Sequence, residues 1–502
     1  MLANKFSYYC IYIIFISSII GCTNEKIKVE PENQFPEAIS KIVAKGCARI
    51  GCHTTRGAGN AGGLDFSTWD KMFEGGVNGS PVIPYSSEFS YLMSFINTYA
   101  DLGNSLQPTM PIGAPPLTRD EVILFKNWID NGAPDKNGNV KFSSDASSRS
   151  KIYVVNQGCD RVSVIDAASK VVMRLVKVGI NDQVIESPHA IKVSPDGKYW
   201  YVIFLNAQVV QKFNADTDEW IANISLGPLI GQWNTISFFN NSNKMIVADL
   251  LFNNLLVLVD LDNYTSEILP VSLLSPHGTA ITPDDRYLYV TSNRNGSNII
   301  YKIDMAAQAY TVQEILLEAP LVGLNLNPHE VYIAPGGDKY FVTCQASNEV
   351  RVFDLSNDQL LAIIPVGTKP LEMAFSLSKP YAFVTCEEDA QFGTGKKGSV
   401  YVINYNDLTI VGNPISVFPG YQPHGVAVDD ANGLVYVANR NIDPNGPAPH
   451  HSSSCGGRNG SVIAIDMNTL QLFRKSLQDD FNTSFTYKME LLTDPYFISV
   501  RK

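Results

Sequence analysis

Basic residues are scarce in this sequence of 502 residues. It has 38 Lys and Arg against 49 Asp and Glu, which gives a formal net charge of −11. Nucleic-acid binding depends on clustered Lys and Arg that displace counterions from phosphates, and the sequence has no such cluster. We therefore expect no nucleic-acid partner.

Several other signals are also missing. After the first 21 residues, no apolar run reaches the roughly 18 residues that a membrane-spanning helix needs. No glycine-rich loop lies between a strand and a helix, as nucleotide binding requires, and no nucleophile elbow is present. The composition, with 45% hydrophobic and 17% charged residues, is that of a globular protein.

The N-terminus has the features of an export signal. Lys5 precedes an apolar run at Ile11–Ile20, and the run leads into Ile19-Ile20-Gly21-Cys22, which resembles the lipobox of bacterial lipoproteins. This resemblance implies a signal peptide at 1–21, lipid on Cys22 and a polar tether at 22–33. It also implies a bacterial cell-envelope location, lipid-anchored at the outer membrane or the periplasmic face. The alternative is an ordinary secretory signal, which also predicts export.

Export gives the remaining cysteines a context. The sequence has eight, of which Cys10 leaves with the signal and Cys22 would carry lipid. Outside the cytosol cysteines can form disulfides, although the sequence fixes no connectivity. Cys47 and Cys52 belong to a motif of their own. The cysteines left to form disulfides are therefore Cys159, Cys344, Cys386 and Cys455.

Two cysteines followed at once by a histidine form the most informative motif. The segment Cys47-Ala48-Arg49-Ile50-Gly51-Cys52-His53 has the order that attaches a c-type haem, with two thiols for the vinyl groups and an imidazole for the iron. The usual spacing between the cysteines is two residues, and here it is four. The alternative is a Cys47–Cys52 disulfide in a domain without haem.

Residues 34–140 are predicted to form a small helical domain around this motif. Pro36–Lys45 has helical apolar spacing, and Thr118 with Glu121 forms a capping box for a second helix that ends at Asn131-Gly132. A low-spin haem needs a second axial ligand, commonly a methionine thioether. Met110 lies in a Pro-rich loop before the last helix, whereas Met72 and Met93 lie in helical segments, where methionine usually fills the core.

Longer stretches of this domain are similar to a known family. The segments are Gly63–Trp69, Pro81–Pro84, Met110–Thr118 and Asn127–Ala133, and together they resemble the planctomycete-type cytochrome c domain. The resemblance implies haem attachment at Cys47 and Cys52, proximal ligation by His53 and distal ligation by Met110. The wide cysteine spacing departs from the family's pattern.

The sequence changes character after a Ser-rich linker at 141–150. From 151 to 502 a unit of short alternating strands recurs every 42 to 53 residues, often starting with Pro-His and followed by a Pro-Asp-Gly type turn. A four-stranded repeat of this period is typical of a β-propeller. The starts are marked by His189, Asn234, His277, His329, Leu371 and His424.

The chain ends supply the missing repeat. Asp494–Val500 begins a repeat that nothing follows, and Ile152–Asn156 continues one that lacks its beginning. Together they predict a seventh blade, which closes the ring and leaves no exposed edge. The unit also resembles the YVTN-type repeat propellers. The predicted fold is therefore multidomain: a small all-α cytochrome c domain, then an all-β seven-bladed propeller closed by the C-terminal strand.

The propeller contains six of the seven histidines. In one interpretation the Pro-His imidazoles bond to the backbone of neighbouring blades and fix the ring. In the other, some of them hold copper, another transition metal or a substrate. The first candidates are the histidines that occupy the same position in four repeats: His189, His277, His329 and His424. A more compact set lies in an insertion of the last repeat, at residues 441–459: His450, His451 and Cys455.

The leading prediction is an exported, membrane-anchored cytochrome with one covalent haem c, which exchanges electrons with a redox partner protein or a small-molecule donor. The alternatives are a propeller oxidoreductase with a His-ligated metal or substrate site that passes electrons to the haem, and a non-enzymatic binding lipoprotein. The sequence names no substrate, redox partner, haem potential or oligomeric state.

Overall fold

The computed structural model describes residues 33–57, 59, 61–250, 253–307, 309–317, 325–395, 397–449, 455–476 and 484–501. The predicted signal peptide, Cys22 and the tether up to residue 32 lie outside these ranges. None of the described helices combines the length and apolar composition needed to cross a bilayer.

The region before the linker is helical, as predicted. Both expected helices are confirmed, and Thr118 with Glu121 forms the capping box: the Glu121 carboxylate accepts from the Thr118 N–H at 2.8 Å. Ile39, Ile42 and Val43 are buried on one face of the first helix. The elements are α1 (Glu37–Gly46), α2 (Trp69–Met72), η2 (Ser87–Phe89), α3 (Tyr91–Ile96), η3 (Ala100–Leu102) and α4 (Arg119–Asp130).

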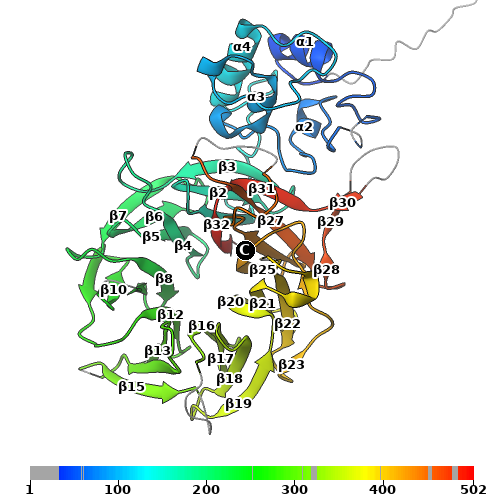
Figure 1. Ribbon diagram of the computed structural model, residues 1–502. Coiled ribbons are helices and arrows are strands. Elements are labelled where there is room, and N and C mark those ends of the chain that lie inside the picture. Colours follow the sequence, from blue (N-terminus) through cyan, green and yellow to red (C-terminus); the bar gives the residue numbers. More distant parts are fainter. Residues whose placement is uncertain are drawn as a thin grey trace, which may run out of the picture.

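Seven antiparallel sheets follow the helical region and form a seven-bladed propeller (Figure 1). Blade 1 contains β32 (Pro495–Arg501), β1 (Lys151–Asn156), β2 (Arg161–Asp166) and β3 (Val171–Lys177). Blade 2 contains β4 (Pro188–Val193), β5 (Tyr199–Phe204), β6 (Val209–Asn214) and β7 (Trp220–Ser225). Blade 3 contains β8 (Trp233–Phe238), β9 (Lys244–Asp249), β10 (Leu256–Asp260) and β11 (Thr265–Ile268). Blade 4 contains β12 (Pro276–Ile281), β13 (Tyr287–Ser292), β14 (Ile299–Asp304) and β15 (Thr311–Leu316).

The last three blades complete the ring. Blade 5 contains β16 (Pro328–Ile333), β17 (Lys339–Cys344), β18 (Glu349–Asp354) and β19 (Leu360–Pro365). Blade 6 contains β20 (Thr368–Phe375), β21 (Tyr381–Glu388), β22 (Ser399–Asn404), β23 (Thr409–Ile410) and β24 (Ile415–Ser416). Blade 7 contains β25 (Pro423–Asp429), β26 (Leu434–Asn439), β27 (Asn459–Asp466), β28 (Gln471–Leu472) and β31 (Lys488–Thr493), and β29 (Arg474–Ser476) pairs with β30 (Ser484–Thr486) outside it.

The predicted closure by both chain ends is confirmed. β32, the last strand, pairs antiparallel with β1, and this pair supplies the two inner strands of blade 1. Around the axis each innermost strand contacts the next, in the order β32, β4, β8, β12, β16, β20 and β25. Figure 1 shows β32 next to β25, on the inner side of the ring where blades 1 and 7 meet. β32 thus covers the edge of β1 that would otherwise be exposed, and this pairing closes the ring.

The Pro-His units begin the innermost strands rather than preceding them. Each strand starts at the proline, and its pairing register then shifts at a β-bulge, as between Pro276 and Thr279 or between Pro328 and Val331. The residue before the proline has a left-handed backbone, with φ of 47° at both Ser275 and Asn327. A bulge redirects side chains at the end of a strand, and here it turns the histidine away from the strand pairing.

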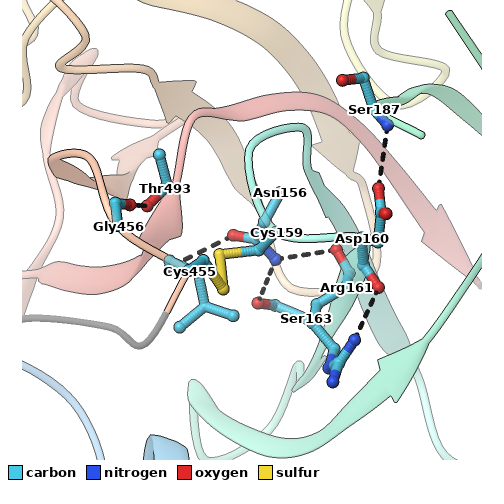
Figure 2. The surroundings of a disulfide bond; sticks show 10 residues. Asn156, Cys159, Asp160, Arg161, Ser163, Ser187, Cys455, Gly456 and Thr493 are labelled. Carbon is cyan, nitrogen blue, oxygen red and sulfur yellow. Dashed lines mark hydrogen bonds between the residues drawn. A yellow bond between two sulfur atoms is a disulfide. The ribbon is translucent and has the colours of Figure 1, made fainter. Parts of the chain in front are cut away.

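A disulfide joins the two blades where the ring closes. Cys159, in the turn between β1 and β2, bonds to Cys455, in the insertion of blade 7, across 296 residues of sequence. Figure 2 shows the bond beside Asn156, whose amide donates to the Ser163 hydroxyl at 2.9 Å. The sequence left the pairing open, and the structure fixes this one while leaving Cys344 and Cys386 as buried free thiols.

The helical region packs on the outside of blades 1 and 7 (Figure 1). Ile83 belongs to the same buried apolar cluster as Tyr487 and Met489 of blade 7. Arg161 of β2 lies 5.5 Å from the centre of the Phe89 ring. The predicted linker is also attached, because Arg149 pairs with Asp166 at 2.7 Å. The helices are therefore docked against the propeller and not connected to it by the linker alone.

A candidate cofactor pocket and a ring of histidines

The segment from Cys47 to His53 folds into a closed turn at the end of α1. The His53 N–H donates to the Cys47 carbonyl at 3.2 Å, and the Cys52 N–H donates to the Arg49 carbonyl at 2.9 Å. Gly51 has φ of +82°, in the left-handed region that glycine enters without a Cβ clash. Ile50 is 98% exposed, so the segment between the cysteines extends into solvent, while Cys47, Cys52 and His53 line the same cavity.

One cavity of about 380 Å³ collects the residues predicted to hold the haem. A cavity of this size lies within the range of small-molecule and cofactor sites. Most of its wall is apolar and comes from Leu64, Phe66, Leu92, Phe95 and Ile96. Its polar or ligating groups include Cys47, Cys52, His53 and Met110.

Met110 reaches the cavity because its loop is held on both sides. Its N–H donates to the Phe95 carbonyl at the end of α3, at 2.8 Å. The next residue, Pro111, packs on α1, where a Cβ added to Gly46 would meet the proline ring at 3.3 Å. The competing Met72 and Met93 are buried at 1% and 7% exposure and do not line the cavity. Of these three thioethers, only that of Met110 faces the cavity.

The chemistry of the donors fits a covalently attached c-type haem. Cys47 and Cys52 are free, so the alternative disulfide between them is not formed. Burial raises the pKa of the Cys47 thiol to about 12, so this side chain is an uncharged thiol at neutral pH. Burial also lowers the pKa of His53 and favours the neutral imidazole that binds iron. Nδ1 of His53 is buried without a hydrogen-bond partner among the described residues.

The four Pro-His histidines meet in the centre of the propeller. His277 and His329 have ring centroids 4.2 Å apart, and His329 and His424 have theirs 6.1 Å apart. Tyr496 fills the same position in blade 1 and lies 3.7 Å from His424 and 4.3 Å from His189. We call the seven side chains at this position the channel ring: His189, Asn234, His277, His329, Leu371, His424 and Tyr496.

The imidazoles of the channel ring have different partners. Nδ1 of His189 lies 2.9 Å from the Gln157 side chain, and Nδ1 of His277 lies 2.9 Å from Oε1 of Glu330. Nδ1 of His329 has no hydrogen-bond partner among the described residues, although the backbone of Leu371 in the next blade raises the pKa of this imidazole. Burial has a larger effect and holds the pKa of His329 well below its usual range. Burial likewise lowers the pKa values of His189 and His424.

Charged side chains surround the channel ring. Glu330 and Glu372 are 4% and 3% exposed, and burial followed by the charge of Glu330 raises the pKa of Glu372 well above its usual range. Burial lowers the pKa of Lys192, although Glu330 and Glu372 act in the opposite direction and raise it. Arg440 forms a two-point ion pair with Asp494 at 2.6 and 2.9 Å, and it lies over the Tyr496 ring.

Sequence reasoning missed the two glutamates and Tyr496 as site residues. Glu330 and Glu372 each follow a channel-ring residue directly, at a position that is Ala, Thr, Gly or Phe in the other blades. A comparison of the repeats at that position is the signal that reveals them. Cys455 was also a candidate ligand, in the set with His450 and His451, but its sulfur is bonded to Cys159 and is not available as a thiolate ligand. His450 and His451 lie outside the described residues.

No protein-family model and no curated protein matches this chain. Among solved structures, hydrazine synthase from Kuenenia stuttgartiensis is 17% identical with a TM-score of 0.47, and the match covers 64% of this chain and 93% of that one. A functionally unknown protein from Desulfotomaculum acetoxidans is 12% identical with a TM-score of 0.49, and the match covers 68% and 99%. At this level such likenesses say nothing about activity, since propellers carry unrelated functions.

Proposed function

We propose that this protein is an exported electron-transfer protein that carries one covalent haem c in its helical region and uses the propeller as a binding platform. The observation that carries the proposal is the convergence of Cys47, Cys52, His53 and Met110 on one largely apolar cavity. These residues come from two separate segments of the helical region, the Cys47–His53 turn and the loop that contains Met110. The disulfide Cys159–Cys455 is in keeping with an oxidising compartment.

Each residue has a distinct part in this proposal. When bound, haem c supplies one-electron exchange between ferrous and ferric iron. Cys47 and Cys52 would attach the group, and His53 and Met110 would hold its iron. The apolar wall excludes water. A site of low polarity disfavours the additional positive charge of the ferric state, so it would raise the reduction potential. Ile112 lines the cavity and is 64% exposed, so the cavity lies close to the surface where an electron partner can approach.

The remaining parts of the proposal concern location and partners. Lipid on Cys22 would anchor the chain in the bacterial cell envelope, and the electron partner would be a redox protein or a small-molecule donor. A second candidate function, a propeller oxidoreductase that passes electrons to the haem, is favoured by the meeting of His277 and His329 in the channel ring.

The test is a haem count on the full-length protein made in a host with a c-type maturation system. A pyridine haemochrome spectrum with iron analysis of the same sample should give one haem per chain. His53→Ala should abolish low-spin haem, and Met110→Ala should keep covalent haem but lose the thioether-to-iron absorption band and lower the potential. The matched control is Met93→Leu, a buried methionine away from the cavity, which should leave the spectrum unchanged.

Other results would contradict the proposal. A colourless protein would favour the binding lipoprotein instead. An intact low-spin spectrum in His53→Ala would remove the assigned proximal ligand. Loss of the thioether band in Met93→Leu, with the band kept in Met110→Ala, would reassign the distal ligand. Cys22→Ser should release the protein from membranes, and retention of this variant in the membrane fraction would contradict the lipid anchor.

A further inference from the structure

Three ligating side chains lie together at the contact between blades 4 and 5, away from the cofactor pocket. They are His277 on β12 and His329 and Glu330 on β16. One ligand atom from each lies within 4.8 Å of the others, and Nδ1 of His277 is 2.9 Å from Oε1 of Glu330. The three residues are only 5%, 4% and 4% exposed.

The backbone holds these side chains on rigid elements. Both histidines lie within the bulge at the start of an innermost strand, and hydroxyl groups of neighbouring strands fix the backbone on each side. The Thr291 hydroxyl donates to the His329 carbonyl at 2.7 Å, and the Glu330 N–H donates to the Thr343 hydroxyl at 3.1 Å. A site built on strands in this way needs little rearrangement to bind a ligand.

Unpaired polar atoms around the same ring are a second, independent observation. Nδ1 of His329, Nδ1 of His424 and both amide atoms of Asn234 are buried without a hydrogen-bond partner among the described residues. Nearly all buried polar groups in native proteins bond to protein, water or an ion. Several such atoms in one ring, next to a carboxylate, indicate that the ring receives a polar ligand.

We propose that His277, His329 and Glu330 bind one divalent first-row transition-metal ion in the propeller channel. Two imidazoles and one carboxylate are a donor set that suits Zn²⁺ and Fe²⁺ and leaves coordination positions open for water or a substrate. Bonds of about 2.0–2.2 Å place neighbouring donor atoms roughly 3 Å apart, as the His277 and Glu330 atoms already are. The carboxylate of Glu330 supplies negative charge that offsets part of the charge of the ion.

The neighbouring residues complete this arrangement. His424, with its ring 6.1 Å from that of His329, is the nearest further imidazole of the channel ring on that side. His189 contacts Gln157 and Tyr496 instead and lies outside the site.

The test measures metal binding to the full-length protein, independently of whether it contains haem. Protein is freed of loosely held metal with a chelator and titrated with Zn²⁺ by calorimetry, and with Co²⁺ by visible absorption. Bound zinc is counted by elemental analysis, and haem is counted separately on the same sample. We expect one Zn²⁺ per chain and a Co²⁺ spectrum typical of nitrogen and oxygen ligands.

Variants separate the site from the rest of the ring. His277→Ala and His329→Ala should each weaken Zn²⁺ binding by more than about 100-fold, and the nearly isosteric Glu330→Gln by at least about 10-fold. The matched control is His189→Ala, which removes a Pro-His imidazole from another blade and should leave the affinity unchanged. Thermal unfolding of each variant identifies any that no longer fold, and Glu330→Gln retains the shape needed if the alanine variants do not.

Three outcomes would overturn the proposal. The first is a wild-type protein that binds clearly less than one Zn²⁺ per chain at micromolar Zn²⁺. The second is an equal loss of binding in folded His189→Ala. The third is unchanged binding in folded Glu330→Gln and in folded His329→Ala. A protein that lacks haem yet binds zinc at this site would sink the haem proposal and leave this one standing, and the reverse result would do the opposite.

Discussion

Single residues decide whether the widened cysteine motif can act as a haem-type motif. With two additional residues, the turn from Cys47 to Cys52 must lengthen without moving the thiols away from His53. Gly51 allows this turn to close. Its φ of +82° lies in the left-handed region, which glycine adopts at a lower conformational free energy than a residue with a side chain. The backbone hydrogen bond from the His53 N–H to the Cys47 carbonyl closes the turn, and the three side chains line one cavity.

At the same scale, one covalent bond contributes to the stability of the ring. Replacing both Cys159 and Cys455 with Ser should lower the free energy of unfolding by about 2–5 kcal/mol, because the bond constrains a very long loop in the unfolded chain. Denaturant unfolding with and without reductant measures this: the reductant should destabilise the wild type and have no effect on the double variant. A wild-type protein that is insensitive to reductant, or peptide mapping that pairs Cys159 with another cysteine, would contradict the pairing.

Among the elements, the innermost strands connect the fold to the site. Each of the Pro-His strands starts with a bulge, so its second residue points off the strand pairing and into the centre. Thr385 of β21 donates to the carbonyl of His424 in the next blade at 2.6 Å, and Thr291 does the same for His329. The histidine backbone therefore locks neighbouring blades together, which leaves several imidazoles free for other partners.

The strand β32 has the largest expected effect of any single element. Ending the chain after Thr493 removes the inner strand of blade 1, exposes the edge of β1 and deletes Tyr496 from the channel ring. We expect aggregation or a broad, non-cooperative thermal transition, measured by size-exclusion chromatography and calorimetry. Removing only Lys502 is the control and should change neither. A monodisperse truncated protein that melts like the wild type would show that the ring does not depend on this strand.

For the whole molecule, the main feature is the docking of the helical region on blades 1 and 7. Gly79 belongs to this contact, since a Cβ there would meet the Met489 side chain at 3.1 Å. Lys475 of β29 also crosses it, donating to the backbone carbonyls of Glu74 in the helical region and of Ser169 in the propeller. Burial lowers the pKa of Lys475 to about 8, so its charged form is disfavoured in the folded protein.

This docking predicts a pH dependence of stability. Between pH 8 and roughly 10.4 the unfolded chain keeps the Lys475 proton that the folded protein has lost, so stability from this group rises with pH through that window. Lys475→Met should lack the rise. Unfolding free energies of both proteins from pH 7 to 10 measure it, because other titrating groups cancel in the difference. Parallel pH curves for the two proteins would contradict the predicted burial of this amine.

The sequence by itself determined the architecture to a large extent. The repeat period predicts the blades. The two incomplete repeats at the chain ends predict the closure by β32, because only a ring joins them into one complete blade. The capping box at Thr118 and the apolar spacing of α1 likewise follow from short-range physics. The residues proposed to hold haem follow from a short motif and one loop, and they line a single cavity.

Tertiary structure alone decided what depends on distance between blades. The sequence placed four histidines in equivalent positions but gave no channel width, so it could not show that His277 and His329 touch while His189 faces Gln157. It also could not pair Cys159 with Cys455, because a contact across 296 residues is set by the closure of the ring and by no local pattern. For the same reason Glu330 emerged as a site residue only when blades 4 and 5 were brought together.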